Sequence, residues 1–90
     1  MQLTKEGHEL LTTILETKEI KVVRFFGKPT VMGFQLQIGI EMPQKGDEVF
    51  DMAGITFAVD PYMKSYVADV IVDAKEVDGE MTLAMTRVVN

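Results

Sequence analysis

The chain has 90 residues, is 47% hydrophobic and 26% charged, and carries a net charge of −5. This length suits one domain, residues 1–90, which can bury about 60–65% of its unfolded surface in a single core. The acidic balance argues against nucleic acid as a partner, because such binding depends on lysine and arginine neutralising phosphates. No apolar run approaches the roughly 18 residues of a membrane span, and the first residues lack the layout of a signal peptide. We therefore expect a cytoplasmic protein that binds neither nucleic acid nor a membrane.

The chain has no cysteine, and this absence excludes more kinds of functional site than any other feature of the composition. It excludes disulfides, thiolate metal sites and cysteine nucleophiles. The chain also has one histidine and one serine, His8 and Ser65, and no spacing links the two. The sequence therefore predicts no catalytic residues, no metal site, no bound cofactor and no enzymatic activity.

An N-terminal helix is predicted from Thr4 to about Thr17. Thr4 is a suitable N-cap, and Leu11, Ile14 and Leu15 have the spacing of a buried helical stripe. His8, in the first turn of this helix, is expected to lie in solvent.

The first strand is predicted from Ile20 to Phe26, followed by a loop at 27–30, because Pro29 cannot donate to a strand ladder. The clearest strand follows at 34–40, where apolar and polar residues alternate with a period of two. Its apolar residues, predicted to face the core, are Phe34, Leu36, Ile38 and Ile40.

The central stretch predicts two short strands, Glu48 to Asp51 and Ile55 to Val59, joined by a turn in which Gly54 adopts positive φ. Asp60 is then expected to cap a short helical turn that starts at Pro61.

The last third predicts a strand from Ala68 to Ala74, a hairpin turn at Asp78-Gly79, and a final strand from Met81 to Val89. Together the patterns predict a mainly β (α+β) fold with one N-terminal helix and six to seven short strands.

The order of several short motifs resembles the HesB/IscA-type family of iron–sulfur cluster assembly proteins. The motifs are the DEVF run from Asp47, the strand from Gly54 that ends in Val59-Asp60, and the Gly33-Phe34 step, within residues 1 to 73. The resemblance implies a compact HesB-like β sandwich or barrel. It also implies a cysteine in the loop before the Gly-Phe step, where this chain has Val31, and two more near the C-terminus, where it has 78–82 without a thiol. Valine cannot ligate iron and a thioether is a poor ligand, so we expect no cluster to be bound.

Charged side chains elsewhere are expected to be solvated. The basic residues Lys18, Lys21, Arg24 and Lys28 are spread along the first strand. The family resemblance places Asp47, Glu48 and Asp51 at a turn, and the C-terminal third adds the carboxylates of Asp69, Asp73, Glu76, Asp78 and Glu80. The acidic groups are interpreted as a solvated rim, with weak divalent-cation binding as the alternative.

The leading hypothesis is a cysteine-free binding or adaptor relative of the iron–sulfur assembly proteins. The alternative is a stand-alone module that binds a small molecule or peptide in the former cluster pocket. The resemblance places the working surface at six residues: Pro29, Val31, Met32, Gly33, Tyr62 and Met81. Val31 and Met32 are predicted either to form an interface with a protein or a second copy, or to fold inward and fill the space of the lost cluster.

Overall fold

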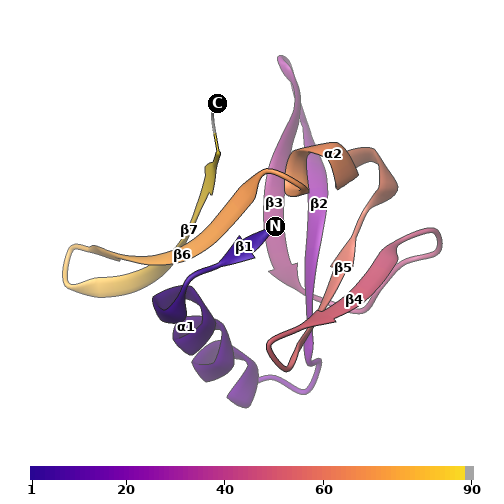
Figure 1. Cartoon of the computed structure of the whole chain (residues 1–90). Helices are drawn as coiled ribbons and strands as arrows, with labels where there is room; N and C mark the ends of the chain where they lie inside the picture. Colours follow the sequence, from indigo (N-terminus) through magenta and orange to yellow (C-terminus); the bar gives the residue numbers. More distant parts are fainter. Residues whose placement is uncertain (89–90) are drawn as a thin grey trace.

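The computed structural model describes residues 1–88, which form a four-stranded and a three-stranded sheet with one long helix beside them (Figure 1). The four-stranded sheet has the order β3-β2-β5-β4, and the three-stranded sheet has the order β1-β6-β7. In chain order the elements are β1 (Gln2–Leu3), α1 (Lys5–Glu16), β2 (Val22–Thr30), β3 (Gly33–Ile40), β4 (Glu48–Met52), β5 (Ile55–Val59), the 3-10 turn η1 (Pro61–Met63), α2 (Lys64–Val67), β6 (Val70–Val77) and β7 (Glu80–Arg87). The mainly β fold with an N-terminal helix is therefore confirmed. No helix within residues 1–88 has the length and apolarity needed to cross a membrane.

Both sheets contain pairings between distant parts of the sequence. In the larger sheet β2 runs parallel to β5, with Val23 opposite Phe57, whereas β2–β3 and β4–β5 are antiparallel hairpins. In the smaller sheet β1 runs parallel to β6, with Leu3 opposite Val72. These parallel pairs tie the start of each sheet to a strand that comes much later in the chain.

Two tight turns each consist of a glycine preceded by another residue with positive φ. Ala53 and Gly54 join β4 to β5 with φ of 51° and 81°, and Asp78 and Gly79 join β6 to β7 with φ of 51° and 82°. Two successive residues with positive φ match the twist of an antiparallel hairpin, and glycine, asparagine and aspartate tolerate that conformation best. Both predicted turns are thereby confirmed.

The core lies between the two sheets and α1. Phe57 of β5 is fully buried and stacks between Phe25 and Phe50, with ring centroids 6.0 Å and 5.6 Å away. The other buried apolar residues are Leu11, Leu15, Val23, Ile55, Ala58, Val59, Met63, Val67, Val70 and Val72. The apolar periodicity of β5 and β6 thus predicts their buried faces correctly.

The helix α1 begins as predicted, with Thr4 Oγ1 accepting a hydrogen bond of 3.0 Å from the Gly7 amide. Leu11 and Leu15 are buried, while Ile14 is only half-buried. Gly7 faces β6 so closely that a Cβ at this position would lie 2.6 Å from the carbonyl oxygen of Val72. The glycine that weakens the helix as a local structure therefore permits it to pack directly on the sheet.

The predicted loop at 27–30 is wrong, because β2 continues to Thr30 and pairs with β3 through Pro29 opposite Phe34. The Glu41 amide donates a backbone hydrogen bond to the Val22 carbonyl, so Val22 and Glu41 form a hydrogen-bonded pair. Hydrogen-bonded and non-hydrogen-bonded pairs alternate along an antiparallel ladder, and this alternation makes Pro29 and Phe34 a non-hydrogen-bonded pair. The nitrogen of Pro29 points to the other edge of β2, and β5 pairs with β2 only as far as Phe25. Proline therefore costs this strand no ladder bond.

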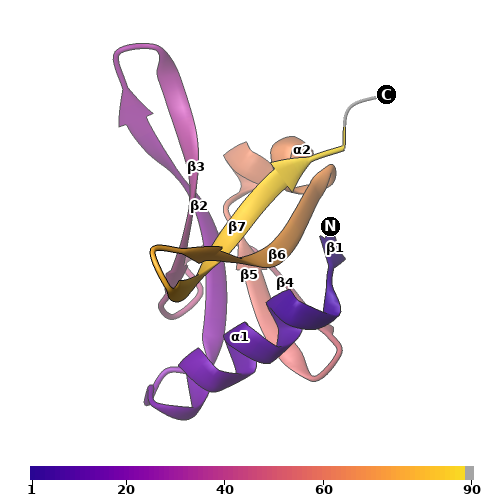
Figure 2. The same ribbon diagram turned by 90° about the vertical axis from the view of Figure 1, so that its left-hand side faces the viewer.

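The extended hairpin also explains why one core prediction fails. Phe34 is 66% exposed, whereas Leu36, Ile38 and Ile40 are half-buried and pack against the core. The upper part of the β2–β3 hairpin stands away from the rest of the molecule (Figure 2). Phe34 lies on this part, beyond the reach of the second sheet. The predicted final strand ends at Arg87 in the structure, and its predicted last residue, Val89, lies outside the described residues.

Candidate functional site

The tip of the β2–β3 hairpin presents two apolar side chains to solvent. Val31 and Met32 are 102% and 93% exposed. Thr30 Oγ1 donates a hydrogen bond of 2.9 Å to the Gly33 carbonyl and accepts one of 3.2 Å from the Met32 amide, which closes the turn. Gly33 follows with φ of 116°, a conformation suited to glycine. The hypothesis that Val31 and Met32 fold inward is therefore wrong.

The six predicted surface residues do not form one patch. Pro29, Val31, Met32 and Gly33 share the hairpin. Tyr62, 85% exposed, lies in η1, which is held beside β2 because the Met63 side chain packs over Gly27. Met81 instead lies against α1, in a hollow shared with Glu6, Glu9, Leu10 and Thr13. The structure thus brings the hairpin and η1 together and separates Met81 from both.

Below the hairpin tip, Arg24 of β2 joins three acidic side chains in a part-buried ion cluster. Its guanidinium donates to Asp47 through Nε at 2.7 Å and Nη2 at 3.1 Å, and to Glu41 through Nη1 at 3.0 Å. Asp60 lies 3.6 Å away. The side chains of Arg24 and Asp47 are 8% and 1% exposed. The expectation that Arg24 and Asp47 are solvated is therefore wrong, although two neighbours in the predicted clusters, Lys28 and Asp51, do lie nearer the surface.

The electrostatics of this cluster are mutually stabilising. The hydrogen bonds from Arg24, helped by the Gln44 amide at 2.9 Å, lower the pKa of Asp47 against the opposing effect of burial. The same hydrogen bonds to Asp47 raise the pKa of Arg24. The Arg24–Asp47 pair holds the segment before β4 onto β2, and Arg24 also lies against the carboxylates of Glu41 and Asp60. The four side chains include no nucleophile paired with a base, so the cluster is interpreted as structural.

The single histidine has a structural contact. His8 Nε2 lies 2.8 Å from the carbonyl oxygen of Ala53, so a hydrogen bond joins α1 to the β4–β5 turn. The prediction that His8 lies free in solvent is wrong in this respect, since the ring is only half-exposed and has a partner.

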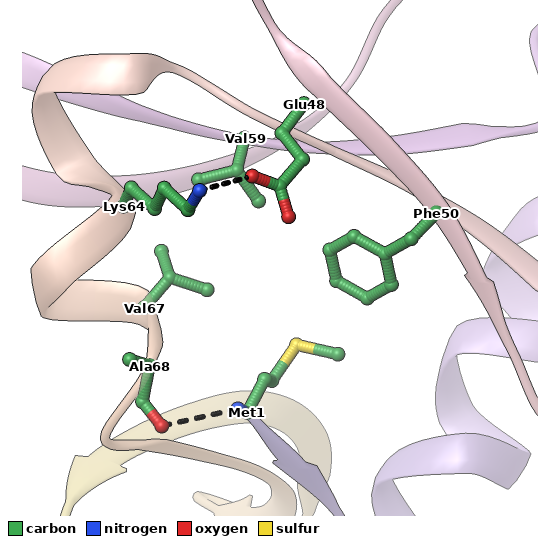
Figure 3. A pocket seen from close by; sticks show the side chains of 7 residues that line it. All are labelled: Met1, Glu48, Phe50, Val59, Lys64, Val67 and Ala68. Carbon is green, nitrogen blue, oxygen red and sulfur yellow. Dashed lines mark hydrogen bonds and ion pairs between the residues drawn. The ribbon is translucent and has the colours of Figure 1, made fainter.

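A shallow cleft of about 250 Å³ lies between β4, α2 and the N-terminal residue (Figure 3). Phe50 and Val67 line opposite sides of the cleft, Val59 also lines it, and Lys64 Nζ and Glu48 Oε2 make an ion pair of 2.7 Å at its border. This ion pair raises the pKa of Lys64. Neither residue was singled out as a ligand-binding residue from the sequence, because the cleft joins segments that no local pattern connects.

A second, larger groove of about 420 Å³ runs along β3. One wall carries Leu36 and Ile38, and the other carries Val70, Met85 and Arg87 of the smaller sheet. Four consecutive residues of β3, Gln35 to Ile38, line this groove, and β2 is the only strand that pairs with β3 among residues 1–88.

The donor groups of this chain do not fit an iron–sulfur cluster. There is no thiol in the sequence, and residues 1–88 bring no three His, Cys, Asp or Glu side chains together in a metal-binding arrangement. Val31, which the family resemblance aligns with a cysteine, contributes only methyl groups. Clusters in proteins are held by thiolates, with histidine as the usual substitute.

Comparisons with solved structures identify proteins that share this fold. No protein-family model matches the sequence, and no curated protein is significantly similar to it. Among solved structures, the chain is similar to IscA with a 2Fe-2S cluster, with a TM-score of 0.77, 16% identity, and coverage of 96% of this chain and 83% of that one. It is also similar to a protein from Aquifex aeolicus solved by NMR, with a TM-score of 0.70, 21% identity, and coverage of 98% and 91%.

A third similar structure is Escherichia coli SufA, which is involved in the biosynthesis of iron–sulfur clusters. Its TM-score is 0.67 at 19% identity, with coverage of 96% of this chain and 78% of that one. At these identities the similarity establishes the architecture. The fold implied by the family resemblance is confirmed: this chain, without a single cysteine, has the fold of IscA and SufA.

Proposed function

We propose that this protein is a non-catalytic binding or adaptor relative of the HesB/IscA-type proteins that does not itself hold a cluster. The observation that carries the proposal is the hairpin tip on an IscA-type fold. Val31 and Met32 extend fully into solvent at the place where the family resemblance implies a thiol. Exposed apolar side chains at a protruding tip are suited to burial against another protein, and aliphatic groups cannot serve as iron ligands.

The loss of cluster binding is tested by anaerobic reconstitution with iron and sulfide. The expected product is colourless after desalting, because no thiolate is available to hold the cluster. A stoichiometric visible charge-transfer band that survives desalting would contradict the proposal. IscA, whose solved structure contains a 2Fe-2S cluster, is treated in parallel and shows that the reconstitution itself works.

The adaptor role is tested by affinity capture from the native cell. The chain and its Val31→Asp, Met32→Asp double variant are used side by side, because both substituted positions are exposed and the variant is expected to fold. The proposal is supported if a protein of iron–sulfur metabolism is captured by the chain and lost with the variant. Equal capture by both proteins contradicts a role of the hairpin tip.

A second candidate function is binding of a small apolar molecule. The cleft in Figure 3 favours it, since Phe50, Val59 and Val67 give it an apolar lining beside the Lys64–Glu48 ion pair. Its volume of about 250 Å³ is below the ~300–1,000 Å³ of typical ligand sites, so it suits a fragment-sized molecule. Shifts of the Phe50 and Val67 NMR signals on titration with small aliphatic acids would favour this function over the adaptor role.

A further inference from the structure

The cleft in Figure 3 has two opposite charges side by side at its border. Lys64 Nζ and Glu48 Oε2 are 2.7 Å apart, and the two side chains are 67% and 51% exposed. Among residues 1–88, neither side chain has a second ion-pair partner. An ammonium group has three donors and a carboxylate has two accepting oxygens, so this one contact leaves hydrogen-bonding capacity on both residues. A second pair of charges can therefore bind beside them without separating them.

The rest of the cleft is lined mainly by apolar side chains that are already held in place by the core. Phe50 and Val67 line opposite sides, and Val59 and Met1 complete the apolar lining. Val59 and Val67 belong to the buried core, and Phe50 and Met1 pack against it. An aliphatic group placed in the cleft would be removed from water against a preformed apolar surface.

The volume of the cleft limits the size of its ligand. A cavity of about 150 Å³ lined by apolar side chains holds benzene, so by proportion the cleft of about 250 Å³ has room for roughly ten non-hydrogen atoms. A nucleotide is too large for this space. A short aliphatic chain with a small charged head group fits it.

The ion pair at the border selects the kind of head group. A free α-amino acid carries a carboxylate and an ammonium group on one carbon atom, so its opposite charges are about as close together as those of Lys64 and Glu48. With the carboxylate at Lys64 and the ammonium at Glu48, the four charges alternate in sign and every close contact is attractive. An aliphatic acid is attracted by Lys64 but repelled by Glu48, and an aliphatic amine meets the reverse.

We propose that the cleft between β4 and α2 binds a free α-amino acid with an aliphatic side chain, of the size of leucine or methionine. Its carboxylate lies on Lys64, its ammonium on Glu48, and its side chain between Phe50 and Val67. This proposal rests on the second candidate function, binding of a small molecule in this cleft, and names the chemical class of that molecule. The head group stays at the exposed border, where charges are screened by water, so the dissociation constant is about 1 mM.

NMR titration of the unaltered chain with L-leucine tests the site. Saturable shifts are expected for the methyl signals of Val59 and Val67 and for the ring signals of Phe50. Two probes each lack one charge of leucine: 4-methylpentanoate has no ammonium group, and 3-methylbutylamine has no carboxylate. Each is expected to bind about tenfold more weakly than leucine, because one charge-assisted hydrogen bond is lost. Glycine has both charges but no side chain, and it is expected to bind more weakly than leucine by a similar factor.

Substitution of either charged residue should change which probe is bound. Lys64→Gln and Glu48→Gln alter exposed side chains, so both variants are expected to fold. Each should weaken leucine binding about tenfold. Lys64→Gln should strengthen the binding of 3-methylbutylamine by removing a repulsive charge, and Glu48→Gln should do the same for 4-methylpentanoate. Lys75→Gln, at an exposed position on β6, changes the net charge as Lys64→Gln does and should leave leucine binding unchanged.

Several results would overturn the proposal. Leucine that causes no saturable shifts well above the expected dissociation constant is one, and leucine binding that is unaltered in either charge variant is another. Equal weakening by Lys75→Gln and Lys64→Gln would show that net charge alone governs binding. Equal binding of leucine and 4-methylpentanoate would reduce the cleft to an apolar site, so the second candidate function would stand without the amino acid. Cluster reconstitution and affinity capture involve no amino acid ligand, so the adaptor role is judged separately.

Discussion

Arg24 and Asp47 form a two-point ion pair with N–O distances of 2.7 Å and 3.1 Å, and both side chains are nearly inaccessible to solvent. The two residues lie 23 positions apart and connect the middle of the larger sheet to the segment that precedes β4. The hairpin rises from the same strand as Arg24, so the pair fixes the base on which the hairpin tip stands.

Removing one partner of this pair should be costly. Asp47→Ala removes two hydrogen bonds from the Arg24 guanidinium and leaves Glu41 and Asp60 as its acidic partners, so we expect a loss of about 1.5–3 kcal/mol in the free energy of unfolding. Urea unfolding followed by circular dichroism measures this loss. Asp51→Ala is a suitable control, because Asp51 is exposed and bonds only to Thr56, and it should cost far less. Equal losses in the two variants would show that the Arg24–Asp47 pair contributes no more to stability than the exposed Asp51 side chain.

The stability should depend on pH in a window set by Asp47. Its pKa is lowered in the folded state by the hydrogen bonds from Arg24, relative to the ordinary value of 3.8. The unfolded state therefore binds this proton first as pH falls. The contribution of Asp47 is fully present above about pH 4 and is lost as pH drops through the folded-state pKa. An NMR titration of the Asp47 carboxyl carbon tests this, and a midpoint at or above 3.8 would contradict it.

Gly7→Ala should destabilise the protein although alanine favours helices. The added Cβ would lie 2.6 Å from the Val72 carbonyl oxygen, so α1 would have to move away from β6. Overpacking of this kind costs about 1–3 kcal/mol, which exceeds the gain of at most ~1 kcal/mol in helix propensity. Thermal unfolding compares this variant with Glu9→Ala on the exposed side of α1, which should be neutral or stabilising. A rise in Tm for Gly7→Ala would show that the backbone contact can relax.

Phe57→Ala should remove about 3–5 kcal/mol from the free energy of unfolding, since Phe57 is fully buried between two aromatic rings. Phe34→Ala deletes the same side chain from the protruding part of the hairpin and should cost well under half as much. Guanidinium unfolding of both variants gives the comparison. Similar losses would mean that the hairpin is packed more tightly in solution than its exposure indicates.

The double variant Val31→Asp, Met32→Asp should unfold at nearly the same denaturant concentration as the unaltered chain. Both side chains extend into solvent, and exposed substitutions usually change stability by no more than about 0.5 kcal/mol. A large loss of stability would instead support the rejected hypothesis that these residues fill a space in the core.

Local patterns in the sequence predicted the elements whose residues contact mainly their own strand or turn. The β3 strand, the Thr4 cap and the Asp78-Gly79 turn each depend on neighbouring residues and are confirmed, although Phe34 of β3 is exposed and does not face the core as predicted. The extension of β2 through Pro29 was missed, because a free edge on the far side of a strand is a property of the sheet. The two-residue strand β1 was missed because two residues show no periodicity.

The candidate site was less predictable than the fold. The sequence gives no sign that Arg24 is the centre of an ion cluster, because its acidic partners Glu41, Asp47 and Asp60 approach it only in the folded chain. Met81 was grouped with Val31 through the family resemblance, and the structure places it beside α1 instead. Residues far apart in sequence meet according to sheet order, which charge and hydropathy patterns do not encode.

The parallel pairing of β1 with β6 also determines when the protein can finish folding. Leu3 is opposite Val72, and the Thr4 hydroxyl donates a hydrogen bond of 2.6 Å to Asp73, 69 positions later. The N-terminal end of α1 is thus anchored only after β6 has been synthesised. Pairings between such distant residues slow folding, typically into the range of milliseconds to seconds. The cause is the conformational entropy lost when the long intervening loop closes, which precedes the favourable contacts between the strands. During that interval the apolar face of α1 has no sheet to pack against, and the nascent chain must remain soluble without it.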